Sequence, residues 1–184
     1  MRRGFLLAAM AVLFGCRPAA DVNLANETAP DPVRNEAPPI ASPAPGTPGG
    51  LPDDRAPLAE PKGPIDPKSA EAAGQVIQHY AAFLEQRRFA DAAALWGDAA
   101  AAAAFAKQFG DSSEAHLQVG KPGDRAGAAG SIYVTVPVVV YGRAPGGAFS
   151  RSGSATLRRV NDVPGSTEEQ RRWHIERIDL GATG

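Results

Sequence analysis

Hydrophobic and polar positions change their spacing along this chain, and each change predicts a different kind of structure. From residue 66 to residue 109, apolar residues recur every three or four positions, which is the period of amphipathic helices. From residue 115 to residue 180 they mostly alternate with polar residues, which is the period of strands. No period is visible between residues 17 and 66. Helices followed by strands are typical of an α+β domain.

Three helices are expected in the first part of this domain. The longest has about 20 residues and begins at Pro67, and the others span residues 92–96 and 99–109. Each follows an aspartate that can accept hydrogen bonds from free backbone amides as an N-cap: Asp66, Asp91 and Asp98.

Four strands are expected after the helices, in residues 115–121, 130–142, 149–161 and 171–180. The second is apolar on both faces, so it should lie centrally with something packed on each side, or form a dimer interface. Pro137 lies in its middle and cannot donate to a ladder, which predicts a bulge or an open edge. In the last strand, Ile175 and Ile178 have opposite parity, which predicts a bulge between them.

Composition divides the chain into three segments. Most of the 17 prolines lie between Pro18 and Pro67, where there is no aromatic residue. Such a segment buries too little apolar surface to offset the entropy of ordering. We therefore expect residues 16–66 to form a disordered, Pro- and Ala-rich tether, and residues 67–181 to form the folded domain.

The first 15 residues have the pattern of an export signal. Arg2 and Arg3 precede an uncharged apolar run over residues 4–14, which is too short for a membrane-spanning helix. Residues 2–6 also resemble a fragment of a twin-arginine signal, although general secretion remains favoured.

The apolar run ends at the only cysteine of the chain, in the order Leu13, Phe14, Gly15, Cys16. This sequence resembles the lipobox of bacterial lipoproteins. The resemblance implies signal cleavage before Cys16, a diacylglycerol thioether on its sulfur and acylation of the new amino group. Arg17, in place of an aspartate, implies sorting to the outer membrane, facing the periplasm. An ordinary secretory signal with an incidental cysteine is the alternative.

The expected domain also resembles a family. Its long helix and Val-rich strand come with three groups of residues: Phe89, Ala92, Leu95 and Trp96; Gly153 with residues 157–160; and Trp173, Ile175 and Ile178. Together they are similar to the nuclear transport factor 2-like, or cystatin-like, cone fold. The resemblance implies a curved four-stranded antiparallel sheet around a long helix, a conical cavity, and a homodimer through the outer sheet face.

Little in the sequence points to a reaction. The net charge of −1 argues against a nucleic-acid partner. The single Cys and three dispersed His favour no metal site, and no motif assigns a cofactor or a catalytic residue. The candidate cavity or ligand residues are His79, Tyr133, Tyr141 and Arg151. Residues 158–159 and 171–172 form a modest basic patch, which predicts a solvated strand face or contact with anionic lipid or glycan.

These observations favour a lipid-anchored cell-envelope protein. Its membrane contact would be the acyl chains on Cys16, and its domain would bind a protein or a small ligand without catalysis. The alternative is a small membrane-tethered enzyme, of isomerase, dehydratase or hydrolase type, that uses the cone cavity.

Overall fold

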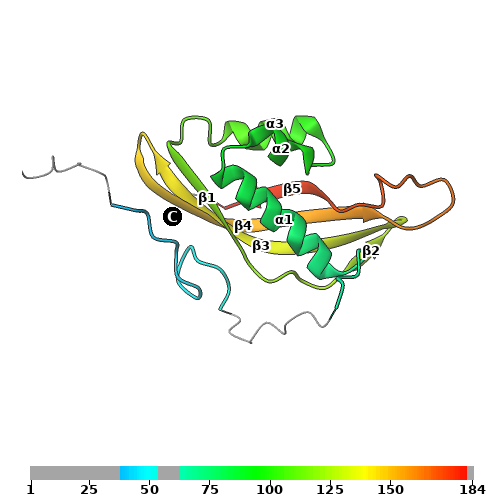
Figure 1. Ribbon diagram of the computed structural model, residues 1–184. Coiled ribbons are helices and arrows are strands. Elements are labelled where there is room, and N and C mark those ends of the chain that lie inside the picture. Colours follow the sequence, from blue (N-terminus) through cyan, green and yellow to red (C-terminus); the bar gives the residue numbers. More distant parts are fainter. Residues whose placement is uncertain (1–37, 54–62, 182–184) are drawn as a thin grey trace, which may run out of the picture. The chain divides into compact units, whose positions relative to one another are not determined.

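The computed structural model describes residues 38–53 and 63–181, which belong to one compact unit that begins at Pro38 (Figure 1). The predicted signal segment and Cys16 lie outside the described residues, as do residues 17–37 and 54–62 of the predicted tether.

Three helices form in the part of the chain that has the helical period, although two of them begin at other residues than predicted: α1 (Ala70–Glu85), α2 (Phe89–Ala94) and α3 (Ala99–Lys107). The Ser69 hydroxyl caps α1 by accepting the Ala72 amide at 3.1 Å. The Asp98 carboxylate caps α3 by accepting the Ala100 amide at 2.8 Å, so this predicted cap is confirmed.

The other two predicted caps are wrong. The Asp66 carboxylate accepts the Lys68 amide at 2.9 Å in a turn before α1, so the helix begins three residues later than expected, after Ser69. Asp91 lies in the first turn of α2 and pairs with Arg88 at 2.8 Å. Helix α2 begins early because Arg87, at φ 57°, reverses the chain in the left-handed region just before it.

The sheet has five antiparallel strands: β1 (Glu114–Val119), β2 (Ala126–Ala128), β3 (Ser131–Ala144), β4 (Gly147–Val160) and β5 (His174–Leu180). Its order is β1-β3-β4-β5, and β2 pairs with the start of β3. The predicted α+β class and the four main strands are confirmed. The short strand β2 was not expected because its Ala-Gly-Ala sequence carries no alternation.

Two irregular positions in the sheet have local causes. The register between β4 and β5 shifts at Thr156 and Leu157, and it skips Glu176 on β5, which confirms the bulge predicted between Ile175 and Ile178. Pro137 keeps a continuous register with β4 and makes no bulge. It lies just beyond the last β1 pair, Val119 with Val138, where only its carbonyl is needed to accept the Gly120 amide at 2.8 Å.

Helix α1 lies across one face of the sheet, which we call the inner face, and α2 and α3 lie beside β5 (Figure 1). One continuous apolar core fills the space between these layers. Its large members include Ile77, Tyr80, Trp96, Phe105, Val134, Val136, Val138, Val140, Leu157, Trp173 and Ile175.

The chain between α2 and α3 pairs with the start of β5 at its free edge. The Ile175 amide donates to the Leu95 carbonyl at 2.9 Å, and the Gly97 amide donates to the Ile175 carbonyl at 3.0 Å. Trp96 and Ile175 thereby form a parallel bridge. This pairing satisfies the edge amide and carbonyl of Ile175 and places Trp96 within the core.

Candidate functional site

The inner face, where the cone resemblance implies a cavity, is filled by aromatic side chains. The Trp96 ring lies 5.5 Å from Phe105 and 6.1 Å from Tyr80, measured between ring centroids. All three are at most 7% exposed. The conical cavity is therefore not confirmed.

Two of the four predicted ligand residues lie away from any common site. His79 is exposed on α1. The Arg151 guanidinium donates to the Gly181 carbonyl and to the Gln108 side chain, both at 3.0 Å. Arg151 thus joins the end of β5 to the end of α3, which is a structural role.

Tyr133 and Tyr141 lie on β3 and point to the opposite, outer face of the sheet, where both are half-buried. Tyr141 stacks on His116 of β1, with ring centroids 5.1 Å apart. The His116 ring nitrogens lie 2.8 Å from a Glu114 oxygen and 3.5 Å from a Glu85 oxygen. His116 and Tyr141 lie directly opposite each other in the β1–β3 register. Side chains in such a cross-strand pair face each other, so an alignment of the two predicted strands would have placed these rings together.

Burial raises the pKa of the Tyr141 phenol, because the ionised form is poorly solvated there. The Glu85 carboxylate raises it further, and a hydrogen bond with Ser42 opposes the shift. Ser42 comes from the predicted tether, so this part of the tether reaches the outer face.

Segment 38–53 lies on the outer face of the sheet, although the sequence predicts that these residues belong to a disordered tether. The Arg143 guanidinium donates to the Pro38 carbonyl at 3.0 Å, and the Leu51 side chain lies over Gly120. The Val139 side chain points to the outer face and is not part of the core between the sheet and the helices, yet it is fully buried. Something does pack on each side of strand β3, as predicted: α1 on the inner face and segment 38–53 on the outer face.

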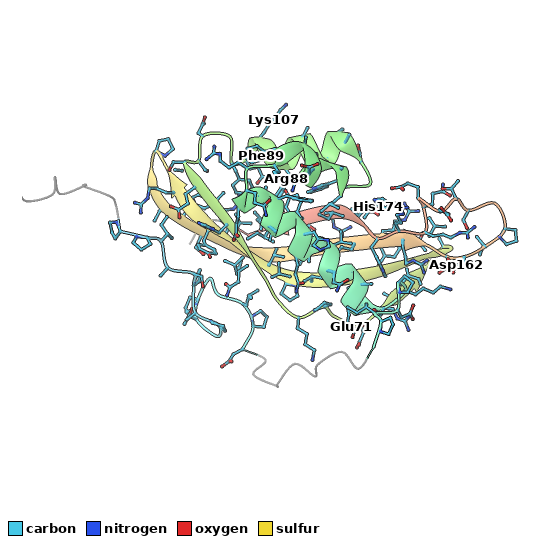
Figure 2. The ribbon with its side chains drawn as sticks, viewed as in Figure 1. Glu71, Arg88, Phe89, Lys107, Asp162 and His174 are labelled. Atoms are coloured by element: carbon cyan, nitrogen blue, oxygen red, sulfur yellow. The ribbon has the colours of Figure 1, made fainter. Side chains whose placement is uncertain are left out.

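A cleft of about 330 Å³ lies at the start of β5 and is lined by Arg158, Glu169, His174 and Glu176, among others. His174 is labelled in Figure 2. Its Nε2 lies 3.0 Å from the Glu169 carbonyl, and its buried Nδ1 has no partner among the described residues. Because basic and acidic side chains both line the cleft, it has no strong preference for one sign of charge.

The predicted basic patch does not form one solvated face. Arg159 is buried, and its guanidinium donates to the Arg171 carbonyl at 2.8 Å and to Asp162 at 2.9 Å. The Arg171 side chain donates to the Ser166 hydroxyl at 2.9 Å. Both arginines hold the loop between β4 and β5, so they are not free to bind an anionic surface.

Within the described ranges, no group of three or more His, Cys, Asp or Glu side chains could hold a metal ion. In the same ranges, no helix has the length and apolar character needed to cross a membrane.

The Tyr80 phenol gives the inner core a measurable pH dependence. Burial raises its pKa from 10.0 to about 12, against a smaller opposing effect of a hydrogen bond with Trp96. Its contribution to stability is fully present below pH 10 and is lost as the pH rises towards 12. Relative to Tyr80→Phe, the wild type should lose about 2–3 kcal/mol of unfolding free energy across this window, measured by urea unfolding. Parallel pH curves for the two proteins would show that the phenol is not buried.

Comparisons with known proteins identify no relative. No family model matches the chain. No curated protein and no solved structure matches it either.

Proposed function

We propose that this chain is a lipid-anchored cell-envelope protein whose α+β domain is a non-enzymatic binding module. The observation that carries the proposal is the position of the only cysteine, directly after Leu13-Phe14-Gly15 at the end of the apolar run. Burial of each CH₂ group of an acyl chain contributes about 0.8 kcal/mol, so two or three chains on Cys16 anchor a protein stably.

A binding role is favoured over catalysis because the described interior holds no convergent polar groups. Tyr80, Trp96 and Phe105 occupy the region where an enzyme of the cone type would need its cavity. Among the described residues, the candidates His79, Tyr141 and Arg151 lie on different surfaces. The order of α1 and the β3–β5 meander supports a fold similar to nuclear transport factor 2-like domains, in a form without an open cavity.

The outer face of the sheet is the surface that we assign to a protein partner. Tyr141, Pro137 and, beneath segment 38–53, Val139 give it apolar character, and a homodimer through this face is one arrangement that it could support. Because Arg17 rather than an aspartate follows Cys16, we place the protein in the outer membrane, facing the periplasm.

Replacing the cysteine tests the anchor. In a two-membrane bacterium that makes the full chain, Cys16→Ser should move the protein from the membrane fraction to the soluble fraction, because no acyl chain can be attached. Arg17→Lys, which keeps Cys16, is the matched control and should stay in the membrane fraction through a high-salt wash. Equal membrane fractions for Cys16→Ser and the control would defeat the lipoprotein proposal.

A further inference from the structure

The outer face of the sheet, with segment 38–53 lying on it, carries an inference about how the binding surface is controlled. We propose that segment 38–53 is a reversible intramolecular cover, and that the face beneath it is a docking site for an extended Pro- and Gly-rich chain. The inference deepens the proposed binding role, on which it rests, and it does not depend on lipid attachment.

The need for a cover comes from the residues of β3. Val139 is 0% exposed, whereas Thr135 on the same face of the same strand is exposed. The difference follows the position of segment 38–53, whose Leu51 lies over Gly120 and beside Pro137. Without this segment, Val139 and Pro137 would present apolar surface to water.

Among the described residues, no backbone–backbone hydrogen bond joins the segment to a strand. The Arg143 guanidinium donates to the Pro38 carbonyl, and Ser42 lies close to Tyr141, so side chains make these links. The hydrogen bonds of the segment are mainly its own: the Gly46 amide donates to the Leu51 carbonyl at 2.8 Å, and the Gly50 amide donates to the Thr47 carbonyl at 2.9 Å. It can therefore leave the sheet without breaking a ladder.

Two features beneath the segment oppose its docking. The buried Gln118 Oε1 and Ser150 Oγ have no hydrogen-bond partner within the described ranges; Ser150 lies under Gly49, and Gln118 is the cross-strand neighbour of Val139. Each would recover a bond to water on release. An open cleft of about 450 Å³ also lies between the segment and the sheet, lined by Thr47, Leu51 and Pro52 of the segment and by Pro137, Ser152 and Gly153 of the strands. Both features reduce the free energy gained on docking, which makes the docked state reversible in this proposal.

Release has a geometric consequence for an anchored protein. The maximal path from Cys16 to the domain is about 75 Å when it ends at the docked Pro38, and about 180 Å when it ends at Ser69. Docking therefore controls both the access to the outer face and the distance of the domain from the membrane.

Thiol reporters on one strand test the cover. In the full chain with Cys16→Ser, a single cysteine is placed by Val139→Cys under the segment, by Thr135→Cys on the open face or by Val136→Cys in the core. With the segment intact, we expect labelling at residue 139 to be slower than at 135 and faster than at 136. Leu51→Ser should raise the rate at 139 about tenfold or more and leave the rate at 136 unchanged.

Ala41→Ser is the matched control for Leu51→Ser. It introduces the same side chain into the same segment, at a position that is exposed. Because no apolar contact is lost there, the labelling rate at residue 139 should stay at its value in the intact segment.

Three results would overturn the proposal. Equal rates at 139 and 135 would show that the segment does not dock. Equal labelling rates at residues 139 and 136, both raised by Leu51→Ser, would show that the segment unfolds only together with the whole domain. Protection at 139 that falls on dilution would identify the occupant as a second copy.

The docking site itself is tested with a synthetic peptide of residues 38–53. Added to the Leu51→Ser protein, it should slow labelling at residue 139 in a saturable manner, whereas a scrambled peptide should not. No slowing, or equal slowing by both peptides, would reject the docking site. The labelling results do not depend on whether the chain with Cys16 intact is found in the membrane fraction. The lipid-anchor proposal and the cover proposal can therefore be rejected independently of each other.

Discussion

Gly153→Ala is expected to destabilise the domain by about 3 kcal/mol or more, and to lower its Tm by roughly 10 °C or more. Gly153 lies in β4 between Val138 and Leu180 of the neighbouring strands. A Cβ at this position would overlap the Asp179 carbonyl oxygen and would lie 2.8 Å from the Leu180 Cα. Both are backbone atoms, so only a shift of the β4–β5 ladder could accommodate the methyl group.

Gly146→Ala is the matched control, because nothing lies within 4 Å of a Cβ at that glycine in the turn before β4. We expect its stability to stay within about 0.5 kcal/mol of the wild type. Thermal and urea unfolding of both variants measure the difference. Wild-type stability in Gly153→Ala would mean that the register of β5 on β4 is wrong.

Trp96→Ala is expected to cost about 3–5 kcal/mol of unfolding free energy, because it empties the centre of the inner core. Trp96 is 7% exposed and contacts the rings of Tyr80 and Phe105. The result also bears on function, since a tryptophan that merely lined an open cavity would cost much less to remove.

Phe89→Ala serves as the control for Trp96→Ala. Phe89 is 53% exposed at the start of α2, so its loss should change stability by no more than about 1 kcal/mol. Similar small losses in both variants would indicate an open interior and would restore the enzyme alternative.

Much of the fold was predictable because its elements have strong periods. The Val-rich strand, the bulge near Ile175 and the cap at Asp98 follow from local spacing and side-chain chemistry. The start of α1 differs from the prediction because Asp66 and Ser69 are both good caps, and the sequence does not say which of them makes a preceding turn. Strand β2 depends on pairing with β3 rather than on its own residues.

The candidate site was less predictable for a physical reason. Chemistry alone favours His79 and Arg151 as candidates, but His79 is exposed on α1. The partners of Arg151, which are the Gly181 carbonyl and the Gln108 side chain, come from distant elements that spacing does not reveal. The two apolar faces of β3 did predict a layer on each side. The sequence did not identify segment 38–53 as the outer layer. This Pro-rich segment has no regular spacing of apolar residues, and its Leu51 contacts the sheet at Gly120 without any periodic pattern around it.

The most direct test of the proposed lipid anchor is the mass of the mature amino terminus. Protein isolated from membranes is digested with trypsin, which cuts after Arg34 but poorly between Arg17 and Pro18. We predict a peptide of residues 16–34 that begins at Cys16 and carries the added mass of two or three acyl chains. A peptide of residues 4–34 with an unmodified cysteine, or an amino terminus at any other residue, would contradict the proposal.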